Sequence, residues 1–246
     1  RAMGLPVLST RFGEMRLRGL QDQVAFLDEL DRLDLEALVR RAADPAEVEA
    51  ILDVADGIGL SSISDVDYGY AEKVADAVRE RRKIFALHVS ERVREDIDAV
   101  LSLDPSFVVH MIEATDGDML KCSESEVPAV VCPRSNAFFR KVPPLERMAD
   151  CGLDVSIGTD NAMLCNPDLR ADAELFAKIL SSRGGDADDV WKAMSFNSRR
   201  LLHRNDRIWL RKGGPADVAV LPCADTGRPF GALSDRRPVP VYINKK

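Results

Sequence analysis

Three short apolar runs in this chain each lead into a residue that can bind a metal ion or act as an acid or base beside it. Ile84-Phe85-Ala86-Leu87 leads into His88, Phe107-Val108-Val109 into His110, and Val155 to Thr159 into Asp160. A short apolar run is typical of a buried strand. Parallel α/β barrels collect their catalytic groups at the C-terminal ends of such strands. The sequence therefore predicts a parallel barrel with a polar site at one rim.

Strand-like runs alternate with amphipathic helical patterns along the chain, as expected of βα units. The predicted strands lie near residues 7–9, over 57–61, over 129–132, and in the three runs that lead into His88, His110 and Asp160. The predicted helices lie over residues 20–33, 35–54 with a new start at Pro45, 70–82, 92–103, 116–125, 145–151, 169–180 and 187–202. Six strands are two fewer than a closed barrel of this type contains.

These patterns predict an α/β fold, a (β/α)8 TIM-type barrel that is incomplete at its N-terminus, with about six strands present and a small C-terminal β appendage. A chain of 246 residues with 46% hydrophobic content can bury one such core. The start, Arg1 to Gly4, resembles a helix end, so we expect the missing units at the front. Short strand-like runs over 207–210, 216–221 and 239–243 follow, which predicts domains at 1–204 and 205–246.

Composition argues against several classes of partner. The net charge is -7 and the sequence pI is about 5.1, whereas a nucleic-acid partner favours a basic face. No run approaches the roughly 18 apolar residues of a membrane span, and no secretory leader is visible. The five cysteines include no C-x-x-C pair. We therefore expect no nucleic acid, no membrane and a cytoplasmic location.

The candidate site residues each allow two interpretations. His88 is followed three positions later by Glu91, so a ligand and a general acid/base could share one cavity; the alternative is a hydrogen-bonded histidine beside a solvent-facing glutamate. His110 taken alone is typical of a packing residue. Asp160 could ligate a divalent cation or cap the next segment. Three such placements on one rim favour the functional interpretation.

A set of motifs in combination resembles the amidohydrolase superfamily, in its deaminase and chlorohydrolase branch, which includes deaminases of methylthioadenosine and S-adenosylhomocysteine. The motifs are His88-Val89-Ser90-Glu91, His110, Cys132-Pro133-Arg134-Ser135-Asn136 and Gly158-Thr159-Asp160-Asn161. Ser195 to Leu202 and Gly213 to Leu221 resemble that family's last barrel helix and its return into a small β-sandwich. The resemblance thus implies that residues 205–246 are part of a small β-sandwich domain.

The resemblance also implies roles for the site residues. His88 and Asp160 correspond to metal ligands, and Asp160 also to the base for the attacking water. Glu91 corresponds to the proton shuttle to a ring nitrogen, and His110 to the histidine beside that water. The implied catalytic set is Glu91, His110 and Asp160, with one divalent metal ion. Zinc is the first choice, with iron and manganese as alternatives. Cys132–Asn136 is expected to shape a loop.

The chain departs from the family pattern at one point. The family places a His-x-His pair at the end of its first strand, but the three histidines here are His88, His110 and His203. This agrees with the count of strands. We therefore expect the chain to be an incomplete fragment that is inactive alone.

The implied function is a metal-dependent hydrolase that deaminates an amino-heterocycle, such as a purine nucleoside, by attack of a metal-bound hydroxide. The same site would suit a cyclic-amide or imidazolone hydrolase or a chlorohydrolase, and a non-catalytic barrel remnant is a further alternative. We expect a small-molecule substrate as the partner. Such an enzyme could also form a homodimer. The segment Phe138-Phe139-Arg140-Lys141 could supply stacking and a charge contact to a substrate, but we expect an ordinary loop with a buried aromatic pair.

Overall fold

The computed structural model describes residues 8–10, 45–160, 162, 164, 166–203, 212–213, 218–223, 229–235 and 240–242. Several sequence-based expectations fall outside these ranges. They are the helix over 20–33, the first part of the helix over 35–54, the strand over 207–210 and the domain boundary at 204/205.

Six parallel strands form one sheet in chain order. They are β1 (Leu8–Thr10), β2 (Gly57–Leu60), β3 (Ile84–Val89), β4 (Phe107–His110), β5 (Ala129–Val131) and β6 (Val155–Ile157). Each strand pairs in parallel with the next. Consecutive parallel strands joined by helices are the wall of a TIM-type barrel. The predicted α/β class and its strands are therefore confirmed.

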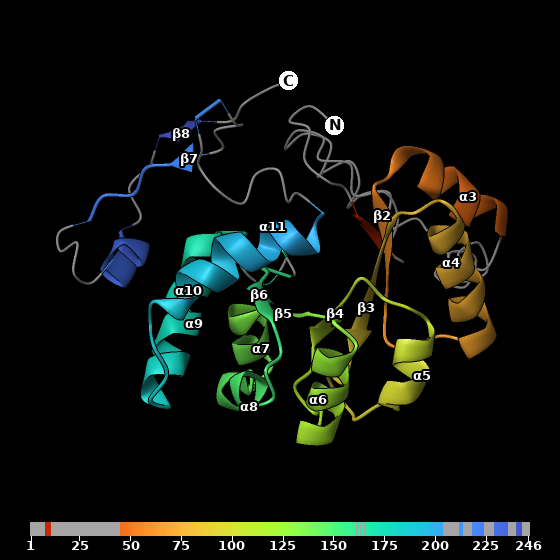
Figure 1. Cartoon of the computed structure of the whole chain (residues 1–246), viewed down its shortest axis with the longest axis horizontal. Coiled ribbons are helices and arrows are strands. Elements are labelled where there is room, and N and C mark those ends of the chain that lie inside the picture. The colour runs from red at the N-terminus through yellow and green to blue at the C-terminus, as the bar shows by residue number, and fades with distance from the viewer. Residues whose placement is uncertain are drawn as a thin grey trace.

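The helices of the main core pack on one face of the sheet, whereas Leu201 of the last helix packs on the other face; the helices follow in chain order (Figure 1). They are α3 (Pro45–Val54), α4 (Tyr68–Glu80), α5 (Ile97–Ser102), α6 (Asp116–Glu124), α7 (Pro133–Phe138), α8 (Leu145–Asp150), α9 (Leu169–Ser182) and α10 (Asp189–Trp191), followed by a π-helical segment η1 (Lys192–Asn197) and α11 (Ser198–Leu201). The expected helix over 92–103 begins only at Ile97, because Asp96 caps it: its side chain accepts from the Asp98 N–H at 3.0 Å. The helix α7 was not predicted.

Local sequence signals explain where these helices begin and end. Thr115 and Asp118 form a reciprocal capping box at the start of α6. Arg82, Asp104 and Glu126, just beyond the ends of α4, α5 and α6, have φ values of 51°, 55° and 56°. This left-handed conformation is a common helix stop. Each βα unit thus turns back toward the sheet at a fixed residue.

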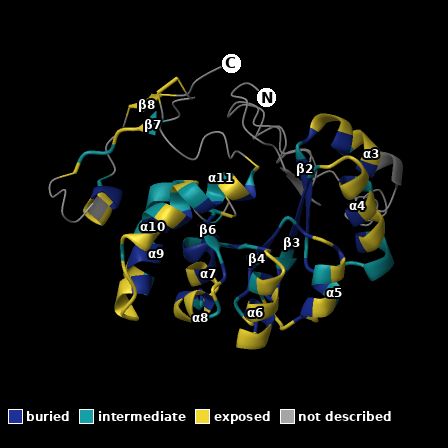
Figure 2. Ribbon diagram, in the orientation of Figure 1, coloured by how far each residue is buried: buried dark blue, intermediate teal, exposed yellow. Residues whose placement is uncertain are grey.

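The two faces of the sheet carry different side chains, since residues alternate along a strand. Phe85, Leu87 and Val89 of β3 belong to the main core, which is shared with the helices. Ile84 and Ala86 face the other way and pack with Phe107 and Leu201 in a separate small cluster. The strands are buried and the outward sides of the helices are exposed (Figure 2). We call the face of Ile84 and Ala86 the inner face.

The inner face leads directly to the polar rim. His88 continues the row of Ile84 and Ala86 on β3, and Asp160 follows the end of β6 by three residues. A Cβ atom at Gly158 would lie 3.0 Å from Val130 Cγ1 and 3.2 Å from Cys132 Sγ. Glycine therefore permits the close approach of β5 and β6 below Asp160.

The C-terminal part contributes a two-stranded antiparallel sheet of β7 (Val218–Ala219) and β8 (Val241–Tyr242). A 3-10 helix η3 (Pro229–Ser234) packs on α9, and its Leu233 is fully buried. The expected small β appendage is present. Among the helices in the described part of the chain, none has the length and apolar character needed to cross a bilayer.

Leu87→Ala is expected to lower the free energy of unfolding by about 2–5 kcal/mol, because Leu87 is fully buried between sheet and helices. Leu120→Ala is the matched control, since Leu120 is 46% exposed. Urea unfolding followed by circular dichroism measures both. Equal losses in the two variants would contradict the assignment of this core.

Candidate active site

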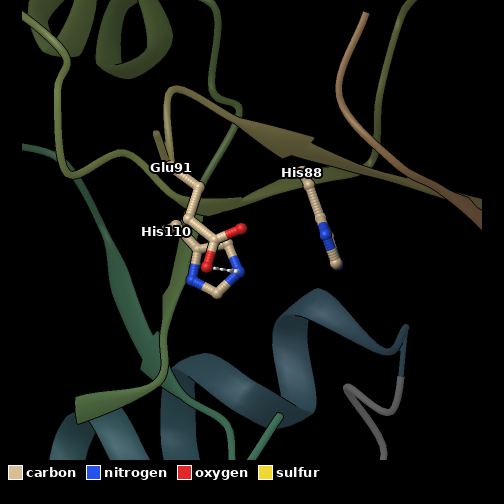
Figure 3. Close-up of side chains that lie close together, drawn as sticks. All are labelled: His88, Glu91 and His110. Atoms are coloured by element: carbon tan, nitrogen blue, oxygen red, sulfur yellow. Dashed lines mark ion pairs between the residues drawn. The ribbon is translucent and has the colours of Figure 1, made fainter. Parts of the chain in front are cut away.

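His88, Glu91 and His110 meet at the C-terminal ends of β3 and β4 (Figure 3). Each offers a possible ligand atom, and these atoms lie within 4.8 Å of one another. The His88 and His110 rings contact edge to face, with centroids 5.1 Å apart and an interplanar angle of 77°. His110 Nε2 lies 3.6 Å from Glu91 Oε1. Two imidazoles and a carboxylate thus share one small volume.

His110 reaches this volume because the backbone departs from regular strand geometry. Its register partner on β3 is Val89, whose side chain packs in the main core. In a regular strand the His110 side chain would therefore also point into the main core, away from the inner face. The φ of His110 is 80°, which breaks the alternation and lets the ring meet His88. Ser90 and Asp160 also have positive φ at strand ends, at 49° and 54°. Such strain costs about 1–3 kcal/mol per residue and clusters at functional sites.

Asp160 joins the same group through His110. Possible ligand atoms of His110, Cys132 and Asp160 also lie within 4.8 Å of one another. His110 belongs to both groups, and the charge of Asp160 acts on both Glu91 and His110. The structure therefore brings all four sequence-predicted residues, His88, Glu91, His110 and Asp160, to one end of the sheet.

Burial sets the protonation of the site. Burial, reinforced by His88, lowers the pKa of His110 to about 4, so this ring is neutral near pH 7. Burial raises the pKa of Glu91, which favours its protonated form. Burial and nearby carboxylates also raise the pKa of the Cys132 thiol. The site thus contains a neutral imidazole beside a carboxyl group that holds its proton more readily than usual.

Helix α7 supplies contacts that the sequence analysis missed. The Ser135 hydroxyl donates to Asp160 Oδ2, and Asn136 Nδ2 lies 3.1 Å from His110 Nδ1. The expectation that Cys132–Asn136 merely shapes a loop was wrong, because the segment is helical and touches two site residues. Pro133 at the first helical position was the available signal.

For Phe138 and Phe139, at the end of α7, the prediction of a buried pair in a loop was also wrong. The Phe138 and Phe139 rings do contact each other, with centroids 5.2 Å apart. Both residues are exposed, at 59% and 52%. They fall at the C-terminal end of α7, where the chain leaves the core for solvent.

Buried polar contacts fix the loops around the site. Glu95 is 6% exposed and accepts the N–H groups of Ser64 and Ser90, both at 2.8 Å. It thereby joins the loops that follow β2 and β3. Arg94, in the same loop as Glu91, donates twice to Asp118 of α6, each time at 2.8 Å. The backbone around Glu91 is therefore held from two sides.

The donor set fits a divalent transition metal. Imidazole nitrogen and carboxylate oxygen are the ligands that zinc, iron and manganese accept. His88 and Asp160 supply one of each; they lie in the two neighbouring groups that share His110. Converging donors at strand ends are the geometry such a site requires.

Comparison with known proteins finds relatives named as aminohydrolases and an imidazolonepropionase. No family model matches the chain. A protein of Methanothermobacter thermautotrophicus named "putative aminohydrolase" is 27% identical over 191 residues, covering 72% of this chain and 47% of the relative. One of the same name from Archaeoglobus fulgidus is 38% identical over 125 residues, covering 50% and 37%. An imidazolonepropionase of Myxococcus xanthus is 27% identical over 195 residues, covering 72% and 44%. The chain spans less than half the length of these relatives.

Solved structures share the fold. A zinc-bound adenosine deaminase from Xanthomonas campestris aligns with a TM-score of 0.61 and 21% identity, over 72% of this chain and 47% of that one. A zinc complex of an atrazine chlorohydrolase from Arthrobacter aurescens TC1 aligns with a TM-score of 0.65 and 15% identity, over 80% and 51%. The chain thus shares its α/β barrel fold with these two structures. The names of the sequence relatives agree with the resemblance to the amidohydrolase superfamily that the motifs gave.

Arg94→Met is expected to lower the free energy of unfolding at pH 7 by about 1–2 kcal/mol. The hydrogen bond from Arg94 lowers the pKa of Asp118 from its ordinary 3.8 to about 2. A depressed carboxyl pKa stabilises the fold above pH 3.8, and this stability is lost as pH falls through 2. Urea unfolding should therefore show the difference between the variant and the wild type shrinking from pH 4 to pH 2.

Arg92→Met is the control for this test. Its pair with Asp65 is at the surface, with side chains 68% and 37% exposed, so its loss should cost less than about 1 kcal/mol. A difference for Arg94→Met that stays constant down to pH 2 would contradict the role of Asp118.

Proposed function

We propose that the protein is a metal-dependent hydrolase that deaminates an amino-heterocycle, a purine nucleoside or a related compound. The observation that carries this proposal is the convergence of His88, Glu91 and His110 at the ends of two neighbouring parallel strands, with Asp160 joined through His110. Acid, base and ligand groups at one rim are what such hydrolysis needs. The aminohydrolase and adenosine deaminase among the similar proteins support the choice of reaction.

His88 and Asp160 would hold one divalent cation, with zinc as the first choice. Zinc is bound in the two solved structures described above, which supports that choice. A bound divalent cation supplies a water acidic enough to act as a nucleophile near pH 7. Asp160 would take up the proton of that water, and its Oδ2 is oriented by the Ser135 hydroxyl.

Glu91 would act as the general acid toward a ring nitrogen of the substrate. Burial raises its pKa, so a proton is available on it closer to neutral pH than on an ordinary glutamate. His110 is neutral, and its Nε2 lies beside Glu91. A neutral imidazole there would hydrogen-bond the group that gains charge in the transition state. Water adds to the ring carbon while the ring nitrogen takes the proton of Glu91. The amino group then leaves as ammonia with the proton that Asp160 took from the water, and the hydroxyl proton of the adduct returns to Glu91 as the carbonyl forms.

Hydrolysis of a cyclic amide is a second candidate. The similarity to an imidazolonepropionase, 27% identity over 195 residues, favours it. The same residues would serve, since water again adds to a carbon bonded to nitrogen and a ring nitrogen again receives the proton. The difference lies in the bond that breaks, so ammonia release separates the two candidates.

The test follows ammonia release and, by chromatography, loss of substrate over aminopurines, aminopyrimidines, aminopterins and cyclic amides. It uses the zinc-loaded protein in a longer form that includes sequence upstream of residue 1, because this chain, which spans less than half the length of its relatives, is expected to be inactive alone. We expect release from at least one amino-heterocycle and its loss after zinc is removed with a chelator. Turnover of cyclic amides alone would replace the deaminase proposal by the second candidate. A longer form that binds no zinc, iron or manganese would indicate a non-catalytic barrel.

Glu91→Gln is expected to lower kcat about 10²- to 10⁴-fold, because a general acid is lost, while zinc content stays unchanged. Glu124→Gln is the matched control, because Glu124 is exposed at the end of α6. Steady-state kinetics and metal analysis measure both effects. Unchanged kcat in Glu91→Gln would remove Glu91 from the mechanism.

A further inference from the structure

One short segment, Pro133–Lys141, contacts three residues of the proposed site. Ser135 donates to Asp160 Oδ2, Asn136 Nδ2 lies 3.1 Å from His110 Nδ1, and Lys141 Nζ donates to the Glu91 carbonyl at 2.8 Å. We propose that this segment, the brace, positions the base, the imidazole and the acid of the site as one unit. The inference rests on the proposed function and adds three positioning residues to it.

The brace is rigid enough for this purpose. Ser135 and Asn136 are 0% and 1% exposed. The Lys141 N–H donates to the Asn136 carbonyl at 2.9 Å, so the end of the brace is tied to its middle. Side chains fixed by burial and backbone hydrogen bonds can hold their partners in one orientation.

Helix α9 anchors the beginning of the brace. Cys132, at the N-cap position of α7, provides no side-chain cap. Asp172 of α9, 0% exposed, instead accepts the Arg134 N–H at 3.0 Å. Its carboxylate thus replaces the missing cap at the start of α7. A buried acid on a neighbouring helix therefore fixes where the brace sits.

Asn136 has a further consequence for His110. Because the Asn136 amide nitrogen can only donate, Nδ1 of the ring accepts from it, and the ring proton of that tautomer lies on Nε2. Nε2 is the atom beside Glu91. The contact therefore selects the tautomer that presents an N–H group to the reacting side of the site. A contact that fixes a histidine tautomer is a positioning contact with a spectroscopic signature.

Lys141 joins the loops that follow β3 and β4. Besides the Glu91 carbonyl, its ammonium group contacts the carboxylate of Glu113. Lys141 is itself only 24% exposed at its side chain, so these contacts are partly shielded from water. They hold the Glu91 backbone through its carbonyl and leave its carboxyl group available for proton transfer.

The Asn136 contact is tested by long-range ¹H–¹⁵N spectra of the imidazole groups at neutral pH. The chain has three histidines, so His88→Gln and His203→Gln variants assign the signals of His110. We expect His110 of the wild-type chain as the Nε2–H tautomer, and a mixture of tautomers in Asn136→Ala. A wild-type His110 protonated on Nδ1, or the same tautomer in the folded variant, would overturn the inference.

The Ser135 contact is tested by zinc affinity, measured by competition with a chromogenic chelator. Ser135→Ala is expected to weaken zinc binding about 10- to 100-fold, as is typical when an outer partner of a ligand is lost. Ser156→Ala is the control: it also removes a buried hydroxyl, from β6, but that hydroxyl has no hydrogen-bond partner among the described residues. Equal affinities of the two folded variants would overturn the role of Ser135.

The Lys141 contact is tested by hydrogen exchange. Lys141→Met is expected to speed the exchange of amides in residues 89–95 about tenfold. Lys121→Met is the control: it removes a lysine of α6 that pairs with Asp98 of α5, and it should leave the exchange of these amides unchanged. Unchanged exchange in Lys141→Met would remove Lys141 from the brace.

The outcomes separate this inference from the proposed function. A wild-type protein without zinc affinity would defeat the proposed function, and the role of Ser135 with it. Tight zinc binding in the wild type together with no effect of Ser135→Ala and Asn136→Ala would defeat the brace alone.

Discussion

The parallel pairing of β3 with β4 is the interaction on which the rest of the structure depends. It sets Val89 against His110, so His88 and His110 begin one step out of phase and on opposite faces. The positive φ of His110 then turns its ring to the inner side, where it meets His88. The strand register brings His88 and His110 close together, and the local backbone sets the direction of the His110 ring. Without both, two histidines 22 positions apart in the sequence would not share a site.

The strain at the rim is balanced by buried polar contacts. Ser90, which has a positive φ, donates its N–H to Glu95 and accepts the Glu95 N–H with its hydroxyl. His110 is held by Asn136, and Asp160 by Ser135. A conformation that costs a kcal/mol or more persists only where its surroundings determine it in this way. These contacts thus hold the Asp160 carboxylate and the His110 imidazole in place at the rim.

The electrostatics follow from the same placement. His110 is buried at the end of β4 and lies beside a second imidazole, and these two causes lower its pKa and keep it neutral. Glu91 lies one loop turn beyond β3, partly buried, and holds its proton more readily than an exposed glutamate. An acid and a neutral imidazole side by side are the arrangement that proton transfer to a heterocycle requires. Burial at the strand ends, and not the residue types alone, creates this pair.

Much of the fold could be predicted from the sequence. The six strands are short apolar runs, and the positions of His88, His110 and Asp160 at or beyond their ends follow from those runs. Most helix limits were also close, because capping residues such as Asp67 and Thr115 are local signals. The start of α5 was missed, since residues 92–96 continue its amphipathic pattern although Glu95 is used to join two loops.

The sequence by itself determined the class of fold, the order of the strands and the kinds of side chain at the rim, because alternation of apolar and polar residues along each element depends only on neighbours in the chain. Tertiary structure alone decided which way His110 points, that Asp172 caps a helix 38 residues away, and that Ser135 and Asn136 touch the site. These features arise between segments distant in sequence, where no local preference specifies the partner.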